Sequence, residues 1–321
     1  MRLGLTSSTY QYLFGGWLFP DRSQLSYGAY GQPYPYFSQT PVHIDPTLMF
    51  EWLIVRSGQL GLQVCHAGIG QWDDLAYLAR MKALLQKHQL ELMPAIAADA
   101  VTTGDAAQKA IDGAVTLLYN YRDFGDVKIS KYCTYPMIHT RFTTDPPLDE
   151  QLALITENTR PIVKVAEECG IVLAFENHLD YRAREIIQVI NAIDSPNFRF
   201  LFDTGNTLTV CEDPVDAAYE AAPYTVLVHL KDLRVVPWTV GREFISVMYS
   251  APLGRGCVNN RKILEIMREK APDANNLCLS LELMPMPPNE DEDRWVDASF
   301  EWIRRELTEF LDPKALAAAV G

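Results

Sequence analysis

Hydrophobic residues along this chain switch repeatedly between short apolar runs and longer stretches in which they recur every three or four positions. The short runs predict β-strands and the longer stretches predict amphipathic helices. The expected strands cover residues 2–6, 61–66, 91–96, 126–131, 171–176, 198–203, 225–230 and 277–283. The expected helices cover residues 46–58, 72–88, 104–121, 148–169, 183–193, 213–222, 260–270 and 294–311, with Asp105, Asp213 and Asn260 as expected N-caps.

Eight alternating strand–helix units predict an α/β fold, and for 321 residues this pattern favours one domain, a (β/α)8 TIM barrel spanning residues 1–321. A doubly wound open sheet is the alternative. It is disfavoured because no GxGxxG phosphate loop follows the first expected strand, where Gly15 and Gly16 lie among aromatic residues.

Two insertions interrupt this alternation. Residues 10–45 contain ten aromatic residues among glycines and prolines, and residues 232–258 form a second insertion that we expect to be a loop. The first insertion follows the first strand, which places it on the catalytic face of a barrel. Its aromatic side chains, Trp17 among them, can stack on a sugar or a planar aglycone, or can pack the barrel mouth or a subunit interface.

Net charge and composition limit the classes of molecule that this chain is expected to bind. The formal net charge is −13, and so acidic a chain repels phosphate backbones, which disfavours nucleic-acid binding. No apolar run approaches the roughly 20 residues of a membrane helix, and the N-terminus lacks the features of a signal peptide, so we expect a cytoplasmic protein without membrane contact. The six scattered cysteines form no CxxC motif, and we expect reduced thiols.

Metal-ligand side chains occur where four successive late strands are expected to end. Because the C-terminal ends of barrel strands converge on one face, we expect these side chains to meet. Three carboxylates in a low-dielectric site repel one another unless a cation balances them, and this donor set suits Mn²⁺, Mg²⁺, Fe²⁺ or Co²⁺, with Zn²⁺ also compatible. Any one of them alone could instead be a paired or solvated charge. The residues are Glu176 in FENH, Asp203 in FDTGN, His229 in VHLKD and Glu282 in LSLEL.

These four motifs resemble the metal-binding motifs of the xylose-isomerase-like barrel superfamily. That superfamily includes sugar isomerases and epimerases, inositol-pathway dehydratases and isomerases, and AP endonucleases. The resemblance implies one divalent metal, most often Mn²⁺, bound by Glu176, Asp203, His229 and Glu282. In the isomerase and epimerase branch the two glutamates also shuttle the proton, which implies catalytic roles for Glu176 and Glu282.

AP endonucleases of this superfamily carry additional histidine ligands for further zinc ions. This chain has Asn206 at one of those positions and the turn Gly254-Arg255-Gly256 at the others. Together with the acidic charge, these differences argue against DNA repair.

The expected chemistry is removal of a proton next to a carbonyl of a sugar or keto-sugar, with the metal stabilising the enediolate that forms. An isomerase or epimerase is the first interpretation. The same half-reaction can end in elimination, as in a keto-inositol or dehydroshikimate dehydratase. Elimination after the same proton removal also occurs in the catalytic subunit of a C-glycoside deglycosidase, which works with a small β subunit. A non-enzymatic sugar-binding module is the third interpretation, and we expect a homo-oligomer.

Five further polar residues are candidates for this site. His178 follows Glu176 by two positions and either supports that ligand or contacts substrate. Lys231 could bind an oxyanion or pair with a neighbouring acid, and Arg255 could contact substrate or remain solvated. His139 is a candidate acid or base in the loop after the fourth strand, although a packing role is also open to it. His66, at the end of the second strand, is a weaker candidate of the same kind.

Overall fold

Parallel strands form one curled sheet in the order β3-β2-β1-β11-β8-β7-β6-β5-β4. The computed structural model describes residues 1–10, 13, 45–135, 138–240, 243–284, 286 and 290–313. The strands of this sheet are β1 (Arg2–Thr6), β2 (Val64–His66), β3 (Glu91–Leu92), β4 (Ala95–Ala98), β5 (Ile129–Thr134), β6 (Val172–Glu176), β7 (Phe198–Asp203), β8 (Thr225–Leu230) and β11 (Cys278–Leu281).

The sheet closes into a barrel because its two end strands are consecutive parts of one extended segment. Only Met93 and Pro94 separate β3 from β4. The N–H of Met93 donates to the carbonyl of Cys65 on β2 (3.0 Å), whereas the carbonyl of Pro94 accepts from the N–H of Lys131 on β5 (2.9 Å). Counted as one staggered strand, β3 and β4 complete an eight-stranded barrel, which confirms the predicted fold class.

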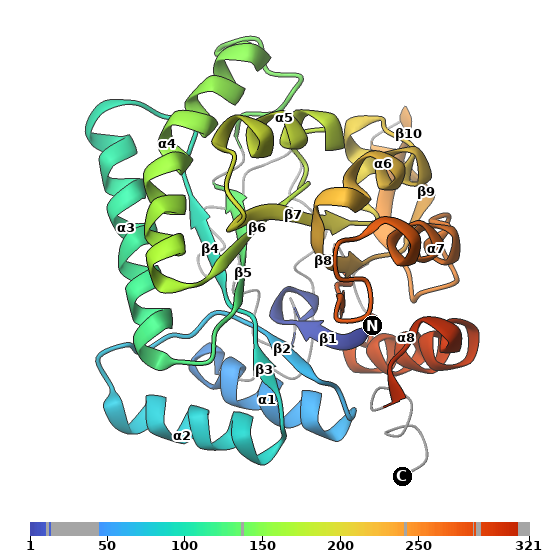
Figure 1. Cartoon of the computed structure of the whole chain (residues 1–321). Helices are drawn as coiled ribbons and strands as arrows, with labels where there is room; N and C mark the ends of the chain where they lie inside the picture. Colours follow the sequence, from blue (N-terminus) through green and yellow to red (C-terminus); the bar gives the residue numbers. More distant parts are fainter. Residues whose placement is uncertain are drawn as a thin grey trace.

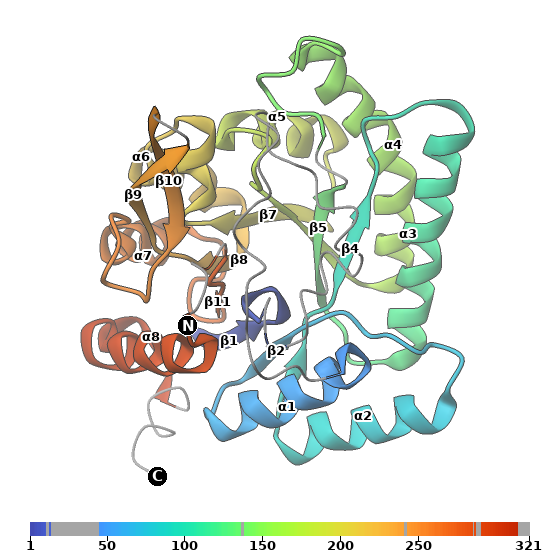
Figure 2. The ribbon, with the colours of Figure 1, turned by 180° about the vertical axis from the view of Figure 1, so that it is seen from behind.

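Helices surround this barrel, as Figures 1 and 2 show from opposite sides. Their amphipathic pattern directs one face of each helix onto the strands. In the described ranges they are α1 (Met49–Gln59), α2 (Leu75–Lys87), α3 (Gly104–Phe124), α4 (Leu148–Cys169), α5 (Ala183–Ile193), α6 (Pro214–Ala221), α7 (Asn260–Lys270) and α8 (Glu292–Glu306). None of the helices in these ranges is both long and apolar enough to cross a membrane.

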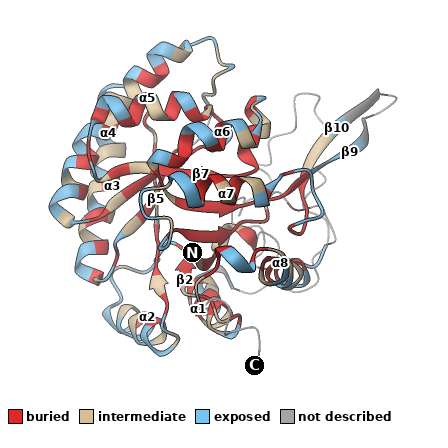
Figure 3. Ribbon diagram, turned by 45° about the vertical axis from the view of Figure 1, so that its right-hand side comes forward, coloured by how far each residue is buried: buried red, intermediate tan, exposed pale blue. Residues whose placement is uncertain are grey.

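Side chains of the strands alternate between two separate apolar layers, and the strands are mostly buried (Figure 3). Outward-facing residues pack under the helices in one large cluster. Gly4 adjoins a small inner layer, since a Cβ there would meet Val64 Cβ at 3.1 Å and Cys278 Sγ at 3.2 Å. The inner layer comprises Val64, Met93, Ala174, Leu201, Leu227 and Cys278.

Polar residues replace this inner apolar layer two positions further along three of the strands. Because side chains on a strand repeat with a period of two, Glu176 follows Ala174 on the inward face of β6. Asp203 on β7 and His229 on β8 follow Leu201 and Leu227 in the same way. The barrel interior therefore changes from apolar to polar towards the C-terminal ends of its strands.

Several of the expected elements begin or end at residues other than the predicted ones. The strand expected at 126–131 begins later, at Ile129, because Gly125 and Asp126 form a turn with φ of 87° and 61°. The 277–283 strand ends at Leu281, one residue before Glu282. The helix expected at 294–311 ends at Glu306 and is followed by a short 3-10 helix, Thr308–Phe310.

One of the three expected helix caps is confirmed. Asp213 accepts from the N–H groups of Val215 (2.8 Å) and Asp216 (3.1 Å) at the start of α6. The other two were wrong. Asn259, rather than Asn260, caps α7, and Asp105 lies in the first turn of α3 with Thr103 at the N-cap position. In that first turn the charge of Asp105 still complements the helix dipole.

The structure describes most of the second insertion and little of the first. Residues 232–258 were expected to be a loop but contain an antiparallel hairpin, β9 (Leu233–Val240) and β10 (Glu243–Ser250), which projects from the barrel (Figure 3). Of the aromatic insertion, Tyr10 is fully buried, and its hydroxyl donates to Asp293 Oδ1 (2.8 Å). Trp17 and the other aromatic residues of this insertion lie outside the described residues.

The six cysteines are free, as expected, and Cys65, Cys133 and Cys278 are buried.

Asp232 fixes the turn that follows the hairpin. Its carboxylate accepts from the N–H groups of Gly254 (2.9 Å), Gly256 (2.8 Å) and Val258 (3.0 Å). Gly254 has a φ of 81°, which only glycine adopts without strain, and a Cβ on Gly256 would lie 2.0 Å from Asp232 Oδ1. Both glycines of the GRG turn are therefore required by this contact between turn and carboxylate.

Replacing Gly256 with alanine is expected to lower the free energy of unfolding by about 1–3 kcal/mol, since the methyl group overpacks the Asp232 contact. Urea unfolding measures the change. The matched control is Gly113→Ala in α3, where a Cβ meets nothing within 4 Å and the free energy should rise by about 0.5–1 kcal/mol. Equal effects in the two variants would contradict this account of the turn.

Candidate metal centre

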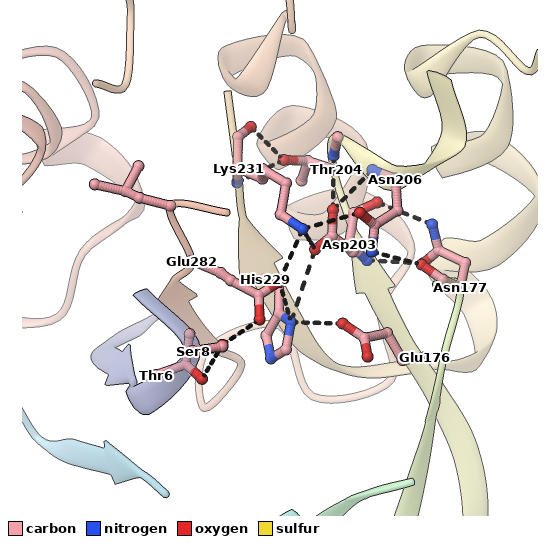
Figure 4. Close-up of polar contacts among 12 residues, drawn as sticks. Thr6, Ser8, Glu176, Asn177, Asp203, Thr204, Asn206, His229, Lys231 and Glu282 are labelled. Atoms are coloured by element: carbon pink, nitrogen blue, oxygen red, sulfur yellow. Dashed lines mark hydrogen bonds and ion pairs between the residues drawn. The ribbon is translucent and has the colours of Figure 1, made fainter. Parts of the chain in front are cut away.

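The four expected metal ligands meet at the C-terminal end of the barrel. Figure 4 shows their side chains pointing towards one another from β6, β7, β8 and the residue after β11. One donor atom from each lies within 4.8 Å of every other, and all four residues are buried. The residues are Glu176, Asp203, His229 and Glu282.

His229 lies between the three carboxylates. Its Nδ1 is 2.8 Å from Glu176 Oε1, 3.4 Å from Glu282 Oε2 and 3.8 Å from Asp203 Oδ2. Burial would lower the pKa of His229, but the carboxylates outweigh burial and raise it to about 10. The imidazole nitrogen that faces the carboxylates is thus held where a positive charge is strongly favoured.

Two lysines supply the remaining counter-charge. Lys231 Nζ lies 3.0 Å from Asp203 Oδ2, 2.9 Å from Glu282 Oε2 and 2.9 Å from Asn206 Oδ1. These three contacts use all three donors of an ammonium group, which favours the pairing role for Lys231 over oxyanion binding. Lys131 Nζ lies 2.5 Å from Glu176 Oε2.

Sequence reasoning missed Lys131, although a signal for it existed. It is the last residue of the strand expected at 126–131, so the strand-end rule that selected the four ligands applies to it as well. In the structure Lys131 faces the barrel interior from the middle of β5, because that strand continues to Thr134.

The lysines keep two of the carboxylates ionised. Burial would raise the pKa of Glu176, but Lys131 and His229 together lower it below its ordinary value. Burial acts in the same direction on Glu282, and there Lys231 and His229 lower the pKa. Ionised carboxylates are the form that binds a cation.

Hydrogen bonds between β6 and β7 position the Asp203 carboxylate. The Asn177 side chain accepts from the N–H of Asp203 (2.7 Å) and donates to its carbonyl (2.9 Å). Asp203 Oδ1 accepts from the N–H groups of Gly205 (2.9 Å) and Asn206 (2.8 Å), which leaves Oδ2 facing the cluster. Asn206 Nδ2 in turn donates to the carbonyl of Asn177 (3.1 Å).

Contacts from other strands position the remaining charged groups. The Thr204 hydroxyl donates to the carbonyl of Lys231 (2.8 Å) and accepts from its N–H (3.0 Å), so β7 fixes the backbone that carries Lys231. The Ser8 hydroxyl donates to Glu282 Oε1, and Thr6 Oγ1 lies 2.9 Å from Ser8 Oγ (Figure 4). These roles could not be predicted from the sequence, because Ser8 and Thr204 are ordinary polar residues beside strands.

His66 contacts the far side of the His229 ring. Its Nδ1 lies 3.3 Å from His229 Nε2, and the ring centroids are 4.9 Å apart. A hydrogen bond there directs the other nitrogen of His229, Nδ1, towards the carboxylates. Burial, together with His229, lowers the pKa of His66 well below its ordinary value. A neutral His66 can accept a hydrogen bond from the N–H of His229 Nε2.

The other candidates differ in their exposure. His178 and His139 are half-buried, each with a buried Nδ1 that has no hydrogen-bond partner among the described residues. Arg255 is exposed on the turn held by Asp232. Trp17 lies outside the described residues. Substrate contact by each of these four residues stays a prediction.

The donor set fits a divalent cation. Glu176 Oε1, Asp203 Oδ2, His229 Nδ1 and Glu282 Oε2 are buried, and their contacts among the described residues are the ion pairs with one another and with Lys231. Three carboxylates against two ammonium groups leave one unbalanced negative charge when His229 is neutral. Oxygen donors with one imidazole suit Mn²⁺, Mg²⁺, Fe²⁺ or Co²⁺, and Zn²⁺ also accepts them.

Comparison with known proteins places this arrangement in a family. Residues 54–306 match the family described as xylose isomerase-like TIM barrel. The chain belongs to that family. Family membership agrees with the closed barrel and with four donor residues at the ends of its later strands.

The individual proteins found by comparison are distantly similar in sequence. The chain is 29% identical over 134 residues, 39% of its own length, to 3-oxo-isoapionate decarboxylase of Pectobacterium atrosepticum, of which it spans 47%, less than half. D-psicose 3-epimerase of Clostridium cellulolyticum H10 with D-tagatose superposes with a TM-score of 0.61 at 17% identity, covering 99% of this chain and 97% of that one. The IOLI protein with a zinc atom superposes with a TM-score of 0.63 at 13% identity, covering 97% and 100%.

Lys231→Met is expected to lower the free energy of unfolding by about 3–5 kcal/mol, because it leaves Asp203 and Glu282 buried without their shared counter-charge. Urea unfolding measures this loss. Lys262→Met is the control, since Lys262 pairs with Glu265 on the surface and should change stability by less than about 0.5 kcal/mol. Similar values for both variants would show that the buried pairing of Lys231 contributes little.

Asp180 should make stability depend on pH. Burial, opposed by the Thr134 hydroxyl that donates to Asp180 Oδ2 (2.6 Å), raises the pKa of Asp180 to about 6 from 3.8. A carboxyl group with a raised pKa stabilises the fold fully below pH 3.8, and this stability is lost as the pH rises through 6. Asp180→Asn, which stays neutral, should therefore be more stable than the parent at pH 8 by about 3 kcal/mol at most.

Urea unfolding of both proteins between pH 4 and pH 8 tests this expectation, with the difference between them growing across the interval from 3.8 to 6. A stability difference that does not change with pH would contradict the raised pKa of Asp180.

Proposed function

We propose that this protein is a divalent-metal-dependent enzyme that removes a proton next to the carbonyl of a sugar or keto-sugar, in an isomerase or epimerase reaction. The observation that carries the proposal is the buried group of Glu176, Asp203, His229 and Glu282, whose donor atoms lie within 4.8 Å of one another at the catalytic end of the barrel. When bound, a divalent cation polarises the carbonyl and stabilises the negative charge of the enediolate.

Two glutamates approach the centre of the site from different sides of the barrel. Glu176 comes from β6 and Glu282 follows β11, and both face His229 Nδ1. Lys131 holds the first carboxylate, and Lys231 with Ser8 holds the second. Glutamates fixed in this way can accept a proton on one face of a substrate and return it on the other, as the resemblance to epimerases implies.

Three histidines with a buried nitrogen that is unpaired in the described part of the chain support a carbohydrate substrate. His66 Nε2, His139 Nδ1 and His178 Nδ1 are buried and have no hydrogen-bond partner among the described residues. Buried polar atoms require a partner, and the hydroxyl groups of a sugar can donate to and accept from such nitrogens. His139 is, in addition, our candidate for a separate acid or base, since imidazole works near neutral pH.

A lyase reaction through the same kind of enediolate, formed by removal of a proton or by loss of carbon dioxide, is the second candidate. It is favoured by the similarity to 3-oxo-isoapionate decarboxylase, an enzyme whose name describes loss of a carboxyl group. A dehydratase or the catalytic subunit of a C-glycoside deglycosidase would use the same enediolate. The small β subunit of the latter, a homo-oligomeric state and a cytoplasmic location stay predictions. Mn²⁺ is our first choice of metal, and the zinc in the IOLI protein keeps Zn²⁺ open.

Protein loaded with Mn²⁺ and incubated with D-tagatose in D₂O should incorporate deuterium next to the carbonyl, detected by NMR. Asp203→Asn should lower bound metal by about 10–100-fold and slow the exchange in parallel, because Asp203 Oδ2 faces the other donor atoms. Exchange without loss of a group supports an isomerase or epimerase. Parallel incubations with 3-keto C-glucosides and with keto acids that release an aglycone, water or carbon dioxide support a lyase.

Glu265→Gln is the control for this experiment, since Glu265 pairs with Lys262 on α7 at the surface. It should leave both metal content and exchange unchanged. Metal-free protein, or Asp203→Asn, that exchanges as fast as the loaded parent would contradict the proposed function.

A further inference from the structure

Lys131 differs from every other charged group in the cluster by being incompletely paired. An ammonium group has three N–H donors, and among the described residues only Glu176 Oε2 is recorded as a partner of Lys131 Nζ. Lys231 has three partners and no donor to spare. Two donors of Lys131 are therefore available to a further acceptor inside the barrel.

Lys131 is also the least buried charged group of this cluster. Its side chain is 13% exposed, whereas those of Lys231 and of the four metal-ligand candidates are at most 3% exposed. The carboxylate that it contacts belongs to Glu176, so an acceptor bound by Lys131 would lie directly beside the metal-ligand candidates.

When a divalent cation is bound, the net charge of the site favours an anion beside Lys131. Three carboxylates, two ammonium groups and a neutral imidazole sum to one negative charge, and one divalent cation changes this to one positive charge. A net charge in a buried site is unfavourable unless an opposite charge accompanies it. A single carboxylate would restore neutrality, whereas a phosphate dianion would leave one negative charge.

We propose that Lys131 binds a carboxylate of the substrate, and that the substrate is accordingly a polyhydroxy keto acid rather than a neutral ketose. The proposal rests on the function proposed above and names the substrate class for that site. Lys131 is then the residue that determines specificity, while Lys231 only balances the charge of the site.

The matched probes are 2-keto-D-gluconate and D-fructose, which share a carbon skeleton and a keto group and differ at C1, where a carboxylate replaces a hydroxymethyl group. Calorimetric titration of the Mn²⁺-loaded protein should show at least about tenfold tighter binding of 2-keto-D-gluconate, as expected for hydrogen bonds to a charged group. Lys131→Met should abolish this preference, and Lys131→Arg should retain much of it, with metal content measured in each variant.

Lys128→Met is the control variant. Lys128 is exposed just before β5, at the opposite end of the barrel, and its replacement should leave the preference for the acid unchanged. Equal affinity of the unchanged protein for the two probes, or no binding of either, overturns the proposal regardless of how the variants behave. A preference that persists in Lys131→Met with normal metal content overturns the role of Lys131.

The outcomes separate this proposal from the proposed function. Binding of 2-keto-D-gluconate that depends on Lys131, without metal-dependent proton exchange on any substrate, would support the carboxylate site and contradict the enzymatic function. Proton exchange on D-tagatose without any preference for 2-keto-D-gluconate would support the enzymatic function and contradict the carboxylate site.

Discussion

Negative charge at the C-terminal end of the barrel must be balanced inside the protein, because Glu176, Asp203 and Glu282 are each at most 1% exposed. Water cannot solvate these carboxylates, and buried charges persist only beside counter-charges or hydrogen-bond donors. Lys131 and Lys231 provide two of the counter-charges, and His229 lies between the three acids. With His229 protonated, as its raised pKa favours, these charges balance. A divalent cation bound by a neutral His229 would take the place of that proton, which is the physical basis for proposing one.

Several residues of the late motifs position neighbouring parts of the backbone in this structure. In FENH, Asn177 holds the backbone of Asp203, and in FDTGN, Thr204 holds the backbone of Lys231. In VHLKD, Asp232 gathers three N–H groups of the GRG turn. The ends of β6 and β7 therefore each fix the end of the next strand around the barrel, and the end of β8 fixes the GRG turn. Such fixed positions keep the ligand side chains from moving apart under mutual repulsion.

The site draws on strands from the whole chain, although its strongest sequence signal lies in the second half. Ser8 after β1 contacts Glu282, and His66 on β2 contacts His229. Lys131 on β5 contacts Glu176. The barrel brings these early residues to the late ligands because β1 pairs with β11 and the remaining strands close the ring. A shift of β1 relative to β11 would therefore disturb Glu282 as directly as a change of the glutamate itself.

Sequence alone determined the strand–helix alternation, the barrel class and the four ligand candidates, since each depends on local information: a period of two or of 3.6, and a polar residue at a strand end. Only the tertiary structure decided which groups balance the ligands. Whether Lys131 faces Glu176, or Lys231 has all three donors occupied, depends on strand register and on closure through Met93 and Pro94. Register and closure are set by contacts between distant segments, and the spacing of residues along the chain does not specify them.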